Sequence, residues 1–410
     1  MSVIGHPLGD LPTVRMRCQR NEAVTTVNRA RQRGYTVTTS FALDREQRAW
    51  CAELRTLAAR RLHPLAAAGE PGRVNRPLVA ALGELGLLAR VLPEDGIVRA
   101  MDLCLLRESL AQESTAAETA LALQGLGACP VVLAGTAEQR SRWLPEVVAG
   151  RAVTAFALSE PGAGSDAAAL ELRAEPAAHG WTLHGEKTWI SNAPGADLHT
   201  VFARTRPGAR AHGITAFLIP AGRPGLGGHP REMTGGHPVG TLTFDGVPVG
   251  PEDVVGEVDG GFRLAMRTLD LFRPSVGALA VGMARAALRA ALAHAGERRA
   301  FGGPLKDLQA VSHQLAEMAT RTEAAALLVH SAAAAHDAGA ADVTGRSAMA
   351  KLYATETAQY VVDAAIQIHG ARALEKGHLL EHLYREVRAP RIYEGATEVQ
   401  RTVIARELYR

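Results

Sequence analysis

The sequence predicts a mixed α+β protein in which a helical segment, a β segment and a second helical segment follow one another. Apolar residues recur at helical spacing before residue 152 and after residue 261, and short runs rich in Val, Thr and Phe fill the stretch between. Gly and Pro clusters separate these runs, as in small barrels and sandwiches. We therefore expect an N-terminal helical domain, a middle antiparallel β barrel or sandwich and a C-terminal antiparallel four-helix bundle.

Length and composition indicate a globular protein of two or three domains. The chain has 410 residues, of which 47% are hydrophobic and 21% charged, so it can bury a sizeable core and is not disordered over most of its length. The formal net charge is only +3, and the charges are interspersed. We expect no nucleic-acid partner, because such proteins usually carry a clustered basic stripe.

The segment boundaries follow from changes of pattern. Residues 1–40 are polar and Arg-rich and form an irregular extension; the N-terminal all-α domain covers 41–151, the middle β domain 152–261 and the helical bundle 262–410. The apolar spacing predicts N-terminal helices over 44–63, ended by Pro64, and over 77–92, 101–124 and 138–148.

The later elements are predicted in the same way. Alternation and β-branched composition predict strands over 152–159, 181–190, 198–205, 214–220 and 241–249. Helical spacing then predicts long helices over 264–300, broken only at Pro274, and over 309–338, 345–370 and 399–408. No internal repeat of 20–50 residues is visible.

The location expected from the sequence is a reducing cytoplasm. The four cysteines, Cys18, Cys51, Cys104 and Cys129, stand far apart without a C-x-x-C pair, which favours neither a disulfide framework nor a zinc ribbon. The N-terminus lacks the basic and apolar regions of a secretory signal. No run of about 18 uncharged apolar residues occurs, so no membrane span is expected.

One metal-binding pattern is present but incomplete. His378-Leu-Leu-Glu381-His382 matches H-x-x-E-H, in which two histidines on one helix face hold zinc and the glutamate acts as base. A third ligand must come from elsewhere, and few residues follow. We expect a solvated helix end and no metal, with a zinc protease as the outside alternative.

Three other segments carry chemistry. The turn at residues 155–166 exposes backbone N–H groups and the hydroxyls of Ser159 and Ser165, which suits a polar ring edge or a phosphate. Trp189 and Ser191 lie two apart on a strand and can flank a flat heterocycle, although core packing explains them equally well. Glu394 lies beside Gly395 in a loop between helices, where a carboxylate is either a helix cap or a buried base.

Together these segments resemble the acyl-CoA dehydrogenase family of flavoproteins, from about Phe41 to Leu408. Six blocks carry the resemblance, in the family's order: LSEPGAGSD (158–166), KTWISN (187–192), LDLFRP (269–274), ERRAFGGPLKDLQ (297–309), QIHGAR (367–372) and LYREVRAPRIYEGATE (383–398). The resemblance implies FAD as cofactor and an acyl-CoA as substrate. A carboxylate removes the α-proton, the β-hydride passes to flavin N5, and a trans-2-enoyl thioester forms.

The resemblance identifies Glu394 as the base. Some relatives place the base just before the Arg of the L-D-x-x-R block, but that position here is Phe272, which cannot take a proton. Substrate contacts are implied for Ser165, Asp270, Arg273 and Gly395. Cofactor contacts are implied for Phe156, Leu158, Ser159, Ser165, Trp189, Ser191, Arg298, Phe301, Gln309, Gln367, Gly370, Thr397 and Glu398.

The resemblance also implies an oligomer, because Arg298, Phe301 and Gln309 match positions that reach the FAD of a neighbouring subunit. A homotetramer or a dimer is expected, with an electron-transferring flavoprotein as electron acceptor. The acyl end of the pocket is implied near residues 119–127, and we expect short or medium chains. Three departures from the family pattern, Ala371, Ala373 and Ala396, are expected to weaken FAD binding.

Several alternatives stay open on the same fold. The acyl group can be tethered to a carrier protein instead of CoA, or electrons can pass to oxygen as in an oxidase. Monooxygenases generally lack the loop carboxylate, so Glu394 weighs against them. A non-enzymatic alternative is a degenerate partner that no longer holds FAD, motivated by the three alanines.

Overall fold

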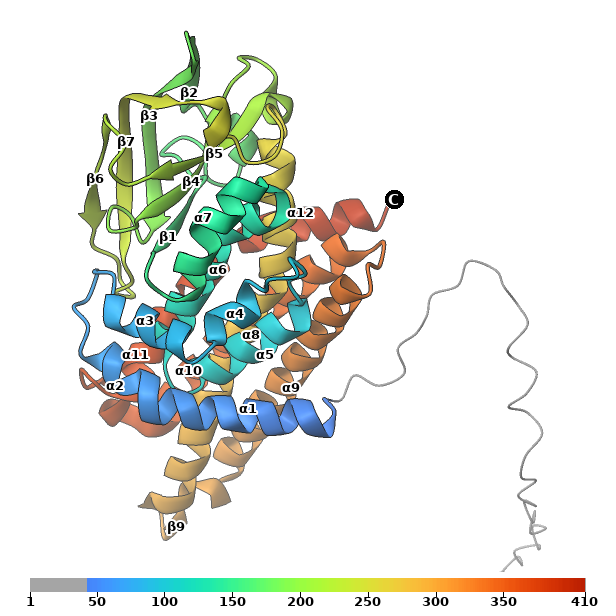
Figure 1. The fold of residues 1–410 in the computed structure, drawn as a ribbon. Coiled ribbons are helices and arrows are strands. Elements are labelled where there is room, and N and C mark those ends of the chain that lie inside the picture. Colours follow the sequence, from blue (N-terminus) through green and yellow to red (C-terminus); the bar gives the residue numbers. More distant parts are fainter. Residues whose placement is uncertain (1–42, 410) are drawn as a thin grey trace, which may run out of the picture. The chain divides into compact units, whose positions relative to one another are not determined.

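The computed structural model describes residues 43–409, which belong to one compact unit (Figure 1). The expected extension at residues 1–40 lies outside the described residues. Within the described chain a helical segment leads into one curled sheet, and a second helical segment follows, so the predicted fold class is confirmed. The domain boundaries themselves stay predictions.

The N-terminal segment contains more helices than the sequence pattern predicts. They are α1 (Arg45–Leu57), a π-helical turn (Ala58–Leu62), α2 (His63–Ala67), α3 (Arg76–Glu84), α4 (Leu87–Val91), α5 (Ala100–Ala111), α6 (Thr115–Ala134) and α7 (Ala137–Val148). Pro64 does not end a helix, because it lies in the first turn of α2, where its missing N–H costs nothing. The helix expected over 101–124 is two helices, since the hydroxyl of Ser114 caps a new one by accepting from the N–H of Ala117.

The middle segment forms a seven-stranded sheet with the order β1-β4-β2-β3-β7-β6, and β5 pairs with β4. The strands are β1 (Thr154–Ala157), β2 (Arg173–Ala177), β3 (Gly180–Ser191), β4 (Leu198–Arg204), β5 (Ile214–Pro220), β6 (Leu226–Arg231) and β7 (Val239–Val249). Pairing is antiparallel except that β1 and β2 each run parallel to β4. The sequence missed β2 and β6, whose residues include Pro176, Pro230 and two glycines that disfavour strands.

The C-terminal segment is built around one long helix. Its elements are α8 (Gly261–Glu297), the hairpin β8 (Arg299–Ala300) and β9 (Gly303–Pro304), α9 (Gln309–Asp337), α10 (Val343–His369), α11 (Leu379–Glu386) and α12 (Thr397–Glu407). The expected break at Pro274 is absent, and α8 continues through it. The carbonyl of Asp270, which loses its helical partner at Pro274, accepts from the hydroxyl of Ser347 on α10 at 3.4 Å.

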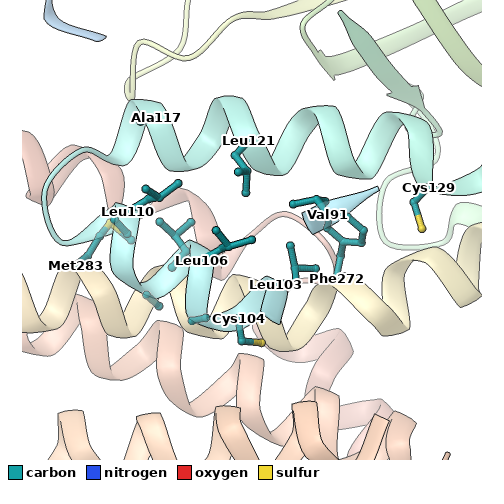
Figure 2. Packing of buried hydrophobic residues seen from close by; sticks show 14 of the residues in the cluster. Val91, Leu103, Cys104, Leu106, Leu110, Ala117, Leu121, Cys129, Phe272 and Met283 are labelled. Atoms are coloured by element: carbon teal, nitrogen blue, oxygen red, sulfur yellow. The ribbon is translucent and has the colours of Figure 1, made fainter. Parts of the chain in front are cut away.

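The core continues from the N-terminal helices into this bundle. Figure 2 shows Val91, Leu103, Leu106 and Leu121 gathered around Phe272 of α8. A Cβ at Gly125 of α6 would lie 2.4 Å from the side chain of Val91 and 3.0 Å from the ring of Phe272. Phe272 is therefore a packing residue, and small residues bring α6 close to α8.

Two helices, α6 and α8, are long and apolar enough to cross a membrane by length and composition alone. In each, 67% of the apolar window is buried inside the structure. Buried core helices of soluble proteins meet the same criterion, and α6 packs against β1 while α8 packs against α5, α9 and α10. This property is therefore weak support for a membrane span.

Candidate functional site

A buried lysine holds the start of the turn at residues 158–166 through two hydrogen bonds. Lys187 of β3 is fully buried, and its Nζ donates to the carbonyl of Leu158 at 2.9 Å and to Oε1 of Glu160 at 2.7 Å. Glu160 also accepts from the backbone N–H groups of Glu171 and Leu172. Burial lowers the pKa of Lys187 to about 8, although Glu160 opposes the shift. The sequence pattern gave Lys187 no role.

This arrangement leaves the polar tip of the turn open. Ser159 is half-buried, and its carbonyl accepts from the N–H of Thr188 at 3.0 Å, which joins the turn to β3. Ser165 is exposed. Phe156 belongs to β1 and Leu158 follows this strand directly. The ring of Phe156 packs on that of Phe202, with ring centroids 4.9 Å apart. The turn thus offers hydroxyls on a rigid apolar support.

Trp189 is presented to solvent from a distorted part of β3. The register of β3 against β7 shifts between Lys187 and Ile190, and Trp189 has a φ of 55°. Its side chain is 48% exposed and Ser191 is half-exposed, whereas Thr188 and Ile190 are buried. Because β3 is distorted at Trp189, regular alternation does not fix the relative orientation of the two residues, and their common face stays a prediction. A tryptophan held in this conformation costs about 1–3 kcal/mol, and such strain concentrates at functional sites.

The loop of Glu394 is held through its backbone. Nε of Arg273 donates to the carbonyl of Glu394 at 3.4 Å, and Nε2 of Gln400 donates to the same oxygen at 3.1 Å. Nζ of the buried Lys351 donates to the carbonyl of Gly395 at 2.6 Å. Glu394 itself has a φ of 51°, a second strained position.

The glycine that follows is required for space as well as for conformation. Gly395 has a φ of 92°, and a Cβ there would lie 2.3 Å from Nε2 of Gln400. Because Gln400 is one of the groups that fix the loop, a side chain at position 395 would displace a contact to the carbonyl of Glu394. Gly395 is thus needed for the geometry of the loop, in addition to the substrate contact that the resemblance implies.

The carboxylate of Glu394 has the environment of a base. Its Oε2 is buried and has no hydrogen-bond partner in the structure. Burial raises the pKa of Glu394, while the positive charges of Arg107, Lys351 and Arg273 oppose the rise. A carboxylate with a raised pKa and an unused oxygen can accept a proton from carbon, whereas a helix cap would be hydrogen-bonded.

A chain of contacts joins the end of β3 to α11, the helix that precedes the loop of Glu394 in the chain. The N–H of Asn192, which follows β3, donates to the carbonyl of Pro238 at 2.7 Å, and the neighbouring His237 pairs with Glu386 of α11. Burial disfavours the charged form of His237, but Glu386 raises its pKa above the usual value. The segment that follows β3 and the helix α11, which are far apart in sequence, are thereby connected in the fold.

Asp270 and Arg273, two of the residues predicted to contact substrate, form one cluster beside the loop of Glu394. Nη1 of Arg273 donates to Asp270 at 2.6 Å, and Thr344 donates to the other oxygen of Asp270 at 3.4 Å. Beyond Gly395, the hydroxyl of Thr397 donates to Glu356 at 2.8 Å, and Glu398 is exposed beside Arg401. The hydroxyl hydrogen of Thr397 is therefore donated to Glu356 and not to a cofactor in this conformation.

A second candidate group lies at the far end of α8. An open cavity of about 330 Å³ is lined by His294, Glu297, Arg298, Arg299 and Arg372. Within residues 43–409 none of the three arginines forms a recorded ion pair. His294 stacks on His369, with ring centroids 4.2 Å apart. Such a cluster of unpaired guanidinium groups suits a phosphate or pyrophosphate.

The remaining predicted cofactor residues gather at this same end. Phe301 is 93% exposed at the tip of the β8–β9 hairpin, with a φ of 52°, and Gln309 begins α9. Gln367 and Gly370 lie at the C-terminus of α10, beside Arg372. Arg298 follows Arg273 by 25 residues along one helix, which corresponds to about 37 Å. One chain therefore does not bring the Arg298 group to its own Glu394.

The three alanine departures differ in their surroundings. Ala371 is exposed, and Ala373 is fully buried in the core, where its methyl packs inward. Ala396 precedes α12 as its N-cap without a side-chain bond. Ala373 thus fills core space. What Ala371 and Ala396 do to FAD binding stays a prediction.

The H-x-x-E-H pattern does not form a metal-binding face. His378 is the N-cap of α11 and its Nδ1 accepts from the N–H of Leu380, so it lies outside the helix that carries His382. His382 pairs with the hydroxyl of Thr115 at 2.7 Å. Among residues 43–409 no group of three or more His, Cys, Asp or Glu side chains is placed to hold a metal ion.

The side chains described above have the chemistry to bind FAD, which carries a flat ring system and two phosphates. Trp189 with the hydroxyls of Ser159 and Ser191 suits the ring, and the arginines at the end of α8 suit the phosphates. These features are those of a flavin-dependent oxidoreductase.

Comparison with known proteins identifies the family. Family models for the N-terminal, middle and C-terminal domains of acyl-CoA dehydrogenase match residues 44–151, 155–247 and 259–409. The chain belongs to the acyl-CoA dehydrogenase family. It is an oxidoreductase of this family, and its cofactor is FAD.

Individual relatives cover nearly the whole chain. Probable acyl-CoA dehydrogenase FadE25 of Mycobacterium tuberculosis is 35% identical over 90% of this chain and 97% of its own. The mitochondrial short-chain specific acyl-CoA dehydrogenase of Bos taurus is 38% identical over 86% and 88%. The structure of butyryl-CoA dehydrogenase from Megasphaera elsdenii matches with a TM-score of 0.85 and 32% identity, covering 90% and 100%.

Two further structures bear on cofactor and substrate. An FAD complex of PigA matches with a TM-score of 0.85 and 26% identity over 90% of this chain and 99% of its own. The prolyl acyl carrier protein oxidase AnaB matches with a TM-score of 0.83 and 26% identity over 90% and 100%. The fold therefore accommodates more than one class of thioester carrier.

Proposed function

We propose that this protein catalyses the α,β-dehydrogenation of an acyl thioester, with Glu394 as the base that removes the α-proton. The observation that carries the proposal is the buried and unpaired Oε2 of Glu394 on a loop fixed through its backbone. FAD, when bound, supplies the acceptor for the β-hydrogen and its electron pair. The product is the trans-2-enoyl thioester.

The chain's own groups account for the proton step. Burial raises the pKa of the carboxyl group, so that it can accept a proton from a weak carbon acid. The backbone N–H of Glu394 makes no recorded hydrogen bond to any described residue. It is free to donate to the thioester oxygen, on which charge develops as the proton leaves. Arg273, Gln400 and Lys351 keep the loop in this orientation.

The proposal is tested by a visible spectrum of the FAD-loaded protein under nitrogen, before and after addition of butanoyl-CoA or octanoyl-CoA. Bleaching of the flavin band together with formation of the enoyl thioester is expected, with short or medium chains oxidised fastest. No bleaching with any acyl-CoA would contradict oxidation of CoA thioesters. Failure to retain added FAD would favour the degenerate partner instead.

A carrier-protein thioester is the second candidate substrate, supported by the likeness to the prolyl carrier-protein oxidase. It is distinguished by repeating the spectrum with an acyl group on the phosphopantetheine of an acyl carrier protein. Faster bleaching with the carrier than with the matching acyl-CoA would favour this candidate. Oxidase activity is distinguished by rapid return of the flavin band in air. Persistence of the reduced state favours an electron-transferring flavoprotein as acceptor.

We also propose that the protein is a homo-oligomer, a dimer or a tetramer, and acts in a reducing cytoplasm. Support for the oligomer comes from the separation of about 37 Å between Arg273 and Arg298 on α8. An FAD whose ring lies beside one Glu394 would then take its phosphate contacts from Arg298 of a second chain. The buried free thiols of Cys51, Cys104 and Cys129 support the location.

Shared sites predict complementation between two inactive variants. Arg298→Met loses FAD because a guanidinium that contacts phosphate is removed, and Glu394→Gln loses the base. Co-expressed chains of the two kinds form mixed oligomers with one complete site per mixed pair. Random pairing should then give about half of the wild-type activity per flavin, and about a quarter per chain. A mixture as inactive as its parents would contradict sharing of the site between chains.

A further inference from the structure

A buried ion pair in the N-terminal helices contacts the turn of α8 that also holds the loop of Glu394. Arg107 of α5 is 3% exposed and its Nε donates to Oε1 of Glu118 on α6, which is 0% exposed. The apolar neighbours Leu106 and Ala117 appear with the core of these helices in Figure 2. Removing two charges from water is costly, so a pair retained at this depth calls for a functional explanation.

The pair is anchored to the helix that also holds the base loop. Nη1 of Arg107 donates to Oγ of Ser275 at 2.6 Å, and this hydroxyl donates to the carbonyl of Phe272 at 2.6 Å. Two residues before Ser275, Arg273 donates to the carbonyl of Glu394. The guanidinium of Arg107 is thus fixed against the same turn of α8 that carries the base loop.

Four charged residues from four different helices, together with the neighbouring Tyr393, act on the charge state of Glu394. They are Arg107 of α5, Glu118 of α6, Arg273 of α8, Lys351 of α10 and Tyr393 of the loop itself. Among the cations, Arg107 opposes the raised pKa of Glu394 most strongly, and Glu118 adds to the rise. Arg273 and Lys351 hold backbone carbonyls of the loop, whereas Arg107 and Glu118 form no recorded bond to it.

We propose that Arg107, held by Glu118 and Ser275, is a positioning residue that sets the charge around Glu394 without a hydrogen bond to any described residue of the loop. Because it sits on a rigid three-helix junction, its positive charge stays at a fixed place when substrate displaces water. Glu118 offsets part of that charge. The two residues together determine the pH range in which Glu394 is ionised. The inference rests on the proposed role of Glu394.

Replacing either member of the pair by glutamine should shift the pH dependence of proton removal, in opposite directions for the two residues. Arg107→Gln removes a positive charge, so Glu394 holds its proton more tightly and the base becomes active at higher pH. Glu118→Gln removes a negative charge, so the base becomes active at lower pH. In Arg107→Gln/Glu118→Gln the two changes oppose each other and no uncompensated buried charge remains. A merely structural role would not move the single variants in opposite directions.

The measurement is uptake of deuterium at the α-carbon of butanoyl-CoA in D₂O, from about pH 5 to about pH 9. The FAD-loaded enzyme is kept reduced under nitrogen, so that proton removal is followed without net oxidation. Each profile is divided by its own plateau at high pH. Relative to wild type, Arg107→Gln should be about tenfold slower at the acidic end and Glu118→Gln about tenfold faster.

The outcomes distinguish a wrong role for Arg107 from a wrong proposed function for the protein. If wild type takes up no deuterium, or Glu394→Gln takes it up normally, the proposed function is wrong. If Glu394→Gln is inactive and the two single variants shift in the same direction or not at all, the role of Arg107 is wrong. Should Arg107→Gln fail to fold, Glu118→Gln is compared with the double variant, which must be active only at higher pH than Glu118→Gln.

Discussion

Glu394→Gln is expected to lower the rate of thioester oxidation by about two to four orders of magnitude. Glutamine has nearly the same size but cannot accept a proton. The contacts that hold the loop use the backbone carbonyls of Glu394 and Gly395, so the fold of the loop should survive. The measurement is the rate of flavin bleaching by butanoyl-CoA in a stopped-flow instrument under nitrogen.

The control for this variant is Glu53→Gln, which changes an exposed glutamate on α1 far from the site in sequence. It should bleach at the wild-type rate and retain the same FAD per chain. Wild-type bleaching by Glu394→Gln, with normal FAD content, would disprove the assignment of the base.

Lys187→Met is expected to give the largest loss of stability, about 3–5 kcal/mol in the free energy of unfolding. The substitution leaves Glu160 as a buried carboxylate without its cation and removes the donor to the carbonyl of Leu158. The turn that carries Ser159 should loosen, and FAD should dissociate more readily. Urea denaturation followed by tryptophan fluorescence measures the first effect, and the ratio of flavin to protein absorbance the second.

Lys376→Met is the matched control, because Lys376 is exposed and forms no recorded ion pair within the described chain. Its free energy of unfolding should stay within about 0.5 kcal/mol of wild type. Equal urea midpoints for Lys187→Met and Lys376→Met would show that the buried pair contributes no net stability.

The fold class was predictable because it depends on periodicity, which short windows of sequence contain. The elements that were missed depend on partners distant in the chain. The stretch with Pro176 reads as a turn, yet it forms β2 because all five of its residues pair with β3. Its pairing with β4 is limited to Arg173 and Arg204, so Pro176 is not needed as a donor on that side. Pro274 reads as a helix break, yet α8 continues because Ser347, 73 positions later, donates to the freed carbonyl.

Some residues of the candidate site could likewise be predicted from the sequence, and others could be found only in the fold. Glu394, Trp189 and the serines could be proposed because their blocks are contiguous and resemble known ones. Arg107, Glu118 and Lys351 could not, since a charged residue on a helix is usually exposed to solvent and the importance of these three depends on packing between helices. A charge at a position where the helical pattern requires an apolar residue was the only signal available.

The continuity of α8 has a consequence for how the sequence can change. One helix carries Arg273 beside the base and Arg298 at the opposite end, so the number of residues between them fixes both distance and direction. Inserting a single residue would advance Arg298 by about 1.5 Å but turn it by about 100° around the helix axis. A change of seven residues nearly restores the direction but shifts the arginine by about 10 Å. The stretch between these two arginines should therefore tolerate substitution far better than any change of length.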